Sequence, residues 1–187
     1  MAKLIFITGG VRSGKSRFAE KRAASIRAEN STLHYIACGQ ASDVEMEARI
    51  SCHQQDREKA VVPWQTLECP KDVGSVASQL EANAVVLLDC VTTLLSNELF
   101  HNGEWSNALF QEQTKQKIQC DIEKLNESSE ALVIVSNELG HEPLEGELVS
   151  VYARLLGEIH QWIVSEADEA YLIEMGLPQI MKGDGIT

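Results

Sequence analysis

Hydrophobic residues along the chain form short continuous runs, separated by longer stretches in which apolar and polar positions alternate with a helical period. The main apolar runs lie at residues 4–7, 33–38, 84–88, 131–135 and 170–173. Short apolar runs bounded by turn residues predict strands buried on both faces of a sheet. Residues 64–68 follow Pro63 and are more polar, which is typical of an edge strand.

Between these runs, apolar residues recur every three or four positions, which predicts helices that pack one face against a sheet. The predicted helices cover residues 16–29, 43–57, 71–81, 105–125 and 146–166. We expect Leu109 and Leu148 to lie on the packed faces of the last two. Strands and helices alternate without an internal repeat or linker, so the pattern predicts one α/β domain over residues 1–187 with five or more mostly parallel strands.

A glycine-rich loop joins the first predicted strand to the first predicted helix. It reads G-G-V-R-S-G-K-S and matches the P-loop pattern G-x-x-x-x-G-K-[ST]. Glycine lets such a loop bring its N–H groups close to a phosphate, while Lys15 reaches the β- and γ-phosphates and Ser16 ligates Mg²⁺. The alternative, a chance glycine turn, does not explain why the motif sits between a strand and a helix. The residues expected at the nucleotide are Gly9, Gly10, Val11, Arg12, Ser13, Gly14, Lys15 and Ser16.

Two other strand ends are candidates for the same site. The apolar run at 84–88 is followed directly by Asp89. An acid in this position is typical of the Walker B acid that orders Mg²⁺ directly or through water. An acid at a strand end is common, but a P-loop in the same chain favours the metal-ligand interpretation. The strand at 33–37 is followed by Cys38 and Gly39. Ala37, Cys38 and Gly39 form either a ligand-facing loop or an ordinary strand-to-helix turn.

The predicted helix at 43–57 places four polar residues on one face, because Glu45, Arg49, His53 and Arg57 are spaced four apart. Two flanking guanidinium groups lower the pKa of a histidine, because they repel its cationic form. A neutral imidazole can attack phosphorus while arginines hold the phosphates. From the pattern alone, a solvated charged helix face is the better interpretation.

Composition narrows the range of partners. The net charge of −12 argues against nonspecific binding to nucleic acid or to an anionic membrane, since both require a basic surface. The five cysteines are scattered and odd in number, which disfavours a disulfide framework and a zinc site. There is no long apolar run. We therefore expect a cytoplasmic protein with no membrane insertion and no nucleic-acid partner.

Several longer motifs occur in order along the chain. They are T-G-G-x-R-S-G-K-S-R at 8–17, Y-I-A at 35–37, E-M-x-x-R-I-x-x-H-x-x-x-R at 45–57, W-x-T-x-E at 64–68, L-L-D-C-V-T-T at 87–93 and S-N-E-L-G at 136–140. Together they resemble the motifs of one family, the bifunctional adenosylcobinamide kinase/adenosylcobinamide-phosphate guanylyltransferase of cobalamin biosynthesis. The resemblance covers nearly the whole chain.

The resemblance implies a RecA-like P-loop sheet assembled as a homotrimer, with ATP, GTP and Mg²⁺ as cofactors. It implies phosphorylation of adenosylcobinamide, followed by transfer of GMP from GTP to adenosylcobinamide phosphate. Lys15 would act in catalysis, and His53 stands where the family carries GMP as a phosphoramidate. Besides the P-loop, the residues implied at the nucleotide are Ala37, Cys38, Gly39, Gln54, Gln55, Asp56, Arg57, Glu68 and Asp89.

The sequence departs from the family pattern near its C-terminal side. After Gly140 the family's G-x-G-x-V-P is replaced by H-E-P-L-E-G, and the next helix has Ser150, Tyr152 and His160 where the family has R, F and N. A member that keeps only one activity is therefore an open alternative. Two others are a small-molecule P-loop kinase without guanylyl transfer and a nucleotide-binding regulator with negligible turnover.

Overall fold

The structure is a computed structural model of the chain, and it describes residues 2–39, 63–139 and 146–184. The strands are β1 (Lys3–Gly9), β2 (Leu33–Ala37), β3 (Trp64–Glu68), β4 (Val85–Asp89), β5 (Ala131–Asn137), β6 (Glu169–Glu174) and β7 (Leu177–Lys182). The helices are α1 (Lys15–Ile26), α3 (Val91–Leu99), α4 (Ala108–Glu127), α5 (Glu147–Glu166) and the 3₁₀ helix η1 (Val73–Gln79).

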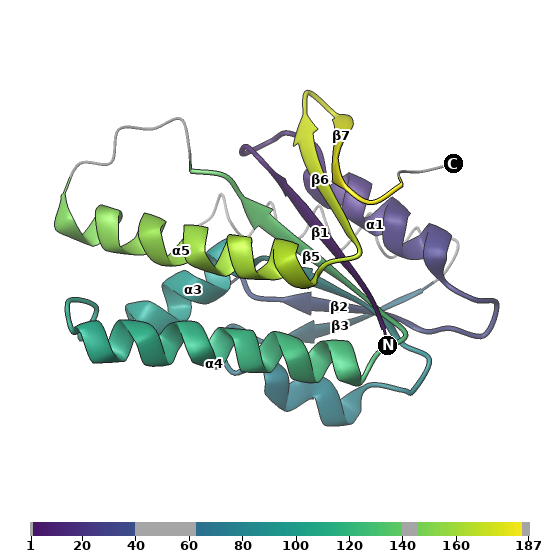
Figure 1. Cartoon of the computed structure of the whole chain (residues 1–187). Helices are drawn as coiled ribbons and strands as arrows, with labels where there is room; N and C mark the ends of the chain where they lie inside the picture. Colours follow the sequence, from purple (N-terminus) through teal and green to yellow (C-terminus); the bar gives the residue numbers. More distant parts are fainter. Residues whose placement is uncertain (1, 40–62, 140–145, 185–187) are drawn as a thin grey trace, which may run out of the picture.

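The strands form one seven-stranded sheet in the order β3-β2-β4-β5-β1-β6-β7. All neighbours are parallel except β6 and β7, which pair antiparallel at one edge. Helices α3, α4 and α5 cover one face of the sheet, and α1 covers the other (Figure 1). The predicted α/β fold with a mostly parallel sheet is confirmed.

Burial on both faces explains the continuous apolar runs in the sequence. In β1, Leu4 and Phe6 pack in the cluster under α3, α4 and α5, whereas Ile5 and Ile7 pack in the cluster under α1. Successive side chains of a strand point to opposite faces, so a strand covered on both sides needs apolar residues at every position. Within the described ranges, no helix is both long enough and apolar enough to cross a membrane.

Three expectations about local structure were wrong. The segment predicted as a helix over 71–81 is the shorter η1, and its Gly74 lies so close to α4 that an added Cβ would meet Asp121 Oδ1. Leu109 and Leu148 are 67% and 40% exposed, because each lies in the first turn of a helix that extends past the packed core. Helix α4 starts later than predicted, since the Asn107 side chain caps it by accepting from the N–H groups of Leu109 and Phe110.

Strand β7 was not predicted at all. Its residues are mostly exposed, and it contains Pro178, which is compatible with a strand only at a sheet edge. The strand exists because a two-residue turn, Met175 and Gly176, folds it back onto β6. Its formation therefore depends on a tertiary pairing that leaves no periodic signal in the sequence.

A buried carboxylate ties α1 to the sheet edge. Glu169 on β6 pairs with Arg22 of α1 at 2.7 Å and with Lys3 at 2.6 Å, and the Tyr171 hydroxyl donates to it at 2.7 Å. Burial by itself would raise the pKa of Glu169, but the hydrogen bonds from Arg22, Lys3 and Tyr171 outweigh it and lower the pKa to about 2.

The substitution Glu169→Gln is therefore expected to lower the free energy of unfolding at pH 7 by about 2–3 kcal/mol. The folded pKa lies below the unfolded value, so the contribution is present above about pH 4.5 and is lost as the pH falls towards about 2. Urea unfolding of both proteins at pH 7 and pH 3 measures the difference, with Glu123→Gln on the exposed face of α4 as control. An equal loss of stability at both pH values would contradict the ion-pair explanation.

Candidate active site

The P-loop between β1 and α1 needs glycine at two positions for different reasons. At Gly9, an added Cβ would lie 2.4 Å from the Ile173 carbonyl oxygen, so any side chain there would collide with β6. Gly14 has a φ of +93°, in the left-handed region that side chains disfavour. These two constraints fix the path by which the chain leaves β1 and enters α1.

Within this loop, the backbone folds around the lysine side chain. The Ser13 N–H donates to the Gly10 carbonyl at 3.2 Å, and the Phe18 N–H donates to the Gly14 carbonyl at 3.1 Å as α1 begins. The Lys15 side chain is buried, and its Nζ donates to the Gly10 carbonyl at 3.0 Å. The ammonium group is thus held inside the loop, at the N-terminus of a helix, where both features favour an anion.

The sheet register brings the other predicted strand ends to the same edge as this loop. Ala37 pairs with both Asp89 and Glu68, and Gly9 pairs with Asn137. Across the sheet, the carboxyl ends of these strands therefore follow one another in the order β3, β2, β4, β5 and β1. Open α/β sheets bind ligands at this edge. Glu68 is exposed and Gly39 is half-buried, so both are accessible there.

Asp89 faces the helix that follows the P-loop. Val85 and Leu87 belong to the cluster under α1, and alternation along β4 places Asp89 on that same face. The buried Tyr35 hydroxyl donates to Asp89 Oδ2 at 2.7 Å, which fixes the orientation of the carboxylate. The acid predicted from the sequence and the N-terminus of α1, with Ser16, thus lie on one face at one edge of the sheet.

Cys38, one of the residues implied at the nucleotide, packs its side chain into the core. Its side chain is fully buried, its N–H donates to the Asp89 carbonyl at 2.9 Å, and its carbonyl accepts from Asn97 at 3.0 Å. Burial raises the pKa of its thiol well above the ordinary value. The Cys38 side chain therefore belongs to the core, and its backbone joins β2 to β4 and α3. The nucleotide contact that the resemblance implies for Cys38 stays a prediction.

Asn137, in the S-N-E-L-G motif, lies at the same edge of the sheet as the P-loop, and we add it to the candidate site residues. It ends β5, beside Gly9, and its N–H donates to Thr92 Oγ1 at 2.7 Å. Thr92 Oγ1 lies 2.9 Å from Ser136 Oγ, which lies 2.7 Å from His160 Nε2. Burial lowers the pKa of His160 to about 4, so this chain of hydrogen bonds ends on a neutral histidine at pH 7. The motif was the only signal for Asn137, because its position depends on the register.

The remaining predicted site residues, His53, Gln54, Gln55, Asp56 and Arg57, lie outside the described residues. The structure therefore leaves their placement relative to the P-loop as a prediction. Along one edge of the sheet, the structure places the phosphate loop with Lys15 after β1 and Asp89 two strands away at the end of β4. Ala37 and Gly39 follow on β2 and after it, and Glu68 lies at the end of the outermost strand, β3.

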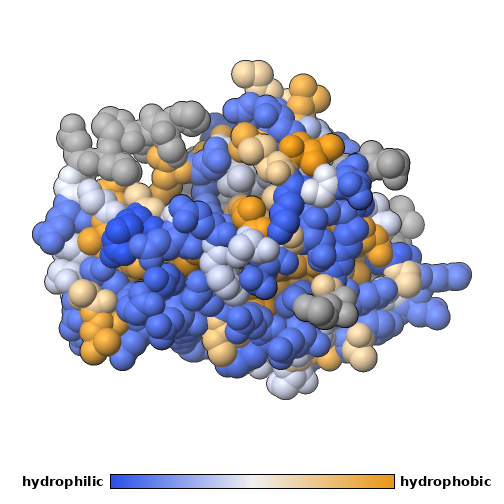
Figure 2. Space-filling model, viewed as in Figure 1, coloured by the Kyte–Doolittle hydropathy of each residue, from blue (hydrophilic) through white to orange (hydrophobic). Residues whose placement is uncertain are grey.

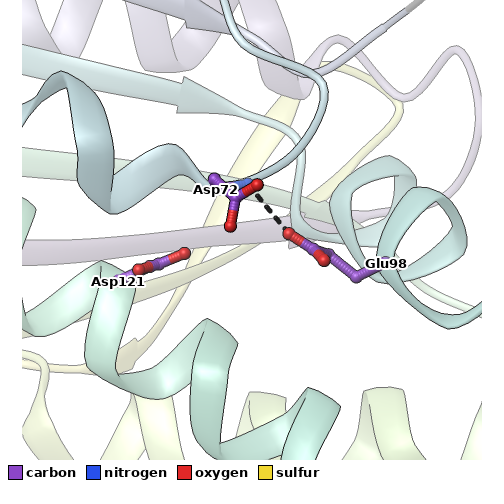
Figure 3. Close-up of side chains that lie close together, drawn as sticks. All are labelled: Asp72, Glu98 and Asp121. Carbon is purple, nitrogen blue, oxygen red and sulfur yellow. Dashed lines mark hydrogen bonds between the residues drawn. The ribbon is translucent and has the colours of Figure 1, made fainter.

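A second group of carboxylates lies away from the P-loop. Asp72, Glu98 and Asp121 approach one another between η1, α3 and α4, and the Asp72 N–H donates to Glu98 Oε1 at 2.8 Å (Figure 3). The ammonium group of Lys117 occupies the centre of this group, 2.7 Å from Asp72 Oδ1 and 3.4 Å from Asp121 Oδ2, and it also pairs with Glu98. The group is thus a structural ion-pair network.

The fold and the loop define a P-loop nucleotide-binding protein. Two solved structures share the fold. One is an ATPase domain, which matches 98% of this chain and 78% of its own with a TM-score of 0.53 at 12% identity. The other is a prototypical ATPase of a bacterial type III secretion system, which matches 95% of this chain and 56% of its own with a TM-score of 0.57 at 14% identity.

The sequence comparisons identify the family within this class. The sequence model described as cobinamide kinase / cobinamide phosphate guanyltransferase matches residues 5–181, and the chain belongs to this family. The bifunctional adenosylcobalamin biosynthesis protein CobU of Escherichia coli (strain K12) is 33% identical over 182 residues, covering 93% of this chain and 97% of that protein. The corresponding CobP of Pseudomonas aeruginosa is 35% identical over 181 residues, covering 95% and 96%.

Proposed function

We propose that this chain phosphorylates adenosylcobinamide with ATP or GTP and then transfers GMP from GTP to adenosylcobinamide phosphate, giving adenosylcobinamide-GDP and pyrophosphate. The observation that carries the proposal is the family match over residues 5–181, in a chain whose P-loop, Lys15 and Asp89 lie at one edge of the sheet. Relatives of nearly the same length carry the name of a bifunctional cobalamin-biosynthesis protein.

The kinase half rests on the P-loop. Phosphoryl transfer requires mainly that the nucleotide be positioned and its developing charge neutralised. The loop N–H groups and the Lys15 ammonium supply fixed positive charge at the β- and γ-phosphates. The hydroxyl of Ser16 and the carboxylate of Asp89 offer oxygen donors on the same face of the sheet, the donor type that Mg²⁺ prefers. When bound there, Mg²⁺ neutralises phosphate charge.

The guanylyl transfer rests on His53. Its imidazole nitrogen forms a bond to the α-phosphorus of GTP, and the bond to pyrophosphate breaks. A phosphate oxygen of adenosylcobinamide phosphate then attacks the same phosphorus, the nitrogen–phosphorus bond breaks, and the histidine is regenerated. A covalent intermediate of this kind replaces one difficult displacement by two easier ones. Neighbouring residues Gln54, Gln55, Asp56 and Arg57, with Glu68, would hold the nucleotide.

Product analysis tests this function directly. The protein is incubated with adenosylcobinamide, ATP and Mg²⁺, then with GTP, and the corrinoids are separated by chromatography. The expected products are adenosylcobinamide phosphate after the first step, and adenosylcobinamide-GDP with pyrophosphate after the second. Phosphorylation without the second product would support a kinase alone. Nucleotide binding with no corrinoid product would support a regulator.

The Tyr35 hydroxyl gives a prediction about the metal site. Tyr35→Phe removes the hydrogen bond that orients Asp89, so the Mg²⁺ concentration for half-maximal kinase activity is expected to rise roughly tenfold. Tyr152→Phe is the matched control, because it removes a hydroxyl bond of 2.7 Å to the Thr92 backbone carbonyl instead. Identical Mg²⁺ dependence in Tyr35→Phe and the wild type would argue against Asp89 as the metal ligand.

The same family resemblance supports a homotrimer in the cytoplasm. The charge of −12 supports the further expectation that neither nucleic acid nor membrane is a partner. Light scattering at several protein concentrations tests the assembly, with the mass of three chains as the expected result and a stable monomer as the contrary one.

A further inference from the structure

The turn between β6 and β7 lies directly against the P-loop. The Gly176 N–H donates to the Ser13 carbonyl at 2.9 Å, and a Cβ added to Gly14 would lie 3.4 Å from the Gly176 Cα. Two contacts from one turn therefore reach the loop that is expected to hold the phosphates. The tip of the β6–β7 hairpin, defined here as residues 175–177, forms part of the rim of that loop.

This tip is apolar and exposed. Met175 is 98% exposed and Leu177 is 71% exposed, and Val11 within the P-loop is 66% exposed. Figure 2 shows hydrophobic side chains at the top of the molecule, where Figure 1 places the hairpin. Large apolar side chains gathered at one exposed place on a protein usually mark a binding surface.

Residue 175 is a methionine in a backbone conformation that methionine disfavours, which supports a role for its side chain in binding a ligand. Glu174 pairs with Leu177, so Met175 and Gly176 form a two-residue hairpin turn, with φ of +51° and +80°. Turns with positive φ at both positions favour Asn-Gly or Asp-Gly. The positive φ strains the backbone at Met175, and its side chain is too exposed to stabilise the core. Residues that violate a local backbone preference without a stabilising contact tend to lie at functional sites.

We propose that the tip of the β6–β7 hairpin, together with Val11, binds the corrin ring of adenosylcobinamide. This inference rests on the proposed function. The hydroxyl to be phosphorylated must meet the γ-phosphate held by the P-loop, so the large and mostly hydrocarbon macrocycle has to remain outside, on the rim. Among the described residues, the hairpin tip is an apolar part of that rim, and its contact with Ser13 fixes it beside the phosphate site.

The test compares two methionines on the same hairpin. Met175→Gln is expected to raise the KM for adenosylcobinamide about tenfold, because one apolar contact with the ring is replaced by a polar one, and to leave the KM for ATP unchanged. Met181→Gln is the matched control: Met181 is 64% exposed but lies near the far end of β7, so its KM values should stay as in the wild type.

A third variant separates binding from folding. Met175→Asn is expected to raise the KM for adenosylcobinamide as well, while its melting temperature equals or exceeds that of the wild type, because Asn tolerates the left-handed turn. An unchanged KM in both Met175 variants would overturn the proposal. So would a KM that rises only as the assembly dissociates in light scattering, since the tip would then be an interface between copies. A wild type that phosphorylates no adenosylcobinamide would instead reject the proposed function.

Discussion

Lys15→Ala is expected to abolish both reactions. The Lys15 ammonium is buried inside the loop, at the start of α1. We expect it to neutralise the β- and γ-phosphates of either nucleotide there. Removing a charge preorganised in a water-poor site typically lowers turnover by about 10²–10³-fold, and here nucleotide binding should weaken as well. Rate measurements for the kinase and guanylyl-transfer steps, with a nucleotide titration, check this expectation.

The matched control for this prediction is Lys21→Ala. Lys21 lies on the same helix but is exposed and is further from the loop, so its loss should leave both rates close to those of the wild type. Full turnover in Lys15→Ala would show that the phosphates are held elsewhere. Because Lys15 also donates to the Gly10 carbonyl, a melting curve for the variant is needed to confirm that it is folded.

His53→Asn is expected to separate the two activities. Without the imidazole nucleophile, guanylyl transfer should fall by about 10⁴-fold or more, a loss similar to that seen when other covalent nucleophiles are removed. Phosphorylation of adenosylcobinamide should continue, because Lys15 and the loop N–H groups are intact. Assays with each nucleotide and with adenosylcobinamide or its phosphate measure the two steps independently.

An exposed histidine in the described part of the chain provides the comparison. His101→Asn changes a residue in the loop after α3, outside the family motif that contains His53, and should affect neither step. If His53→Asn forms adenosylcobinamide-GDP at the wild-type rate, the covalent route through this residue is wrong. If it loses both activities while still folded, His53 contributes to the kinase step as well.

The central strands could be predicted because of how they are buried. A strand covered by helices on both faces needs apolar residues at every position, as in β1 and β4, and this produces runs that are visible in the sequence. Strand β7 has one partner and exposed side chains, so its residues are free of that requirement. Gly74 in η1 packs so closely against α4 that a Cβ would meet Asp121, a tertiary contact that local propensity does not reveal.

The residues of the candidate site also divide into those that the sequence predicts and those that only the folded structure places. The P-loop could be predicted because its glycines, lysine and serine are needed at fixed spacing for one chemical purpose. Tyr35 and Asn137 lie in sequence motifs, but their positions at the site depend on the fold: the Tyr35 hydroxyl bonds Asp89, and the register aligns Gly9 with Asn137. Cys38 was placed at the ligand by its position after a strand and by the family resemblance, and the structure adds that its side chain packs in the core.

The most direct test of the account is mass spectrometry of the protein after incubation with GTP and Mg²⁺. We expect one guanylyl group on the peptide that contains His53, lost in acid, stable in alkali, and transferred when adenosylcobinamide phosphate is added. Formation of adenosylcobinamide-GDP with no such adduct, or with the group on a different residue, would contradict it.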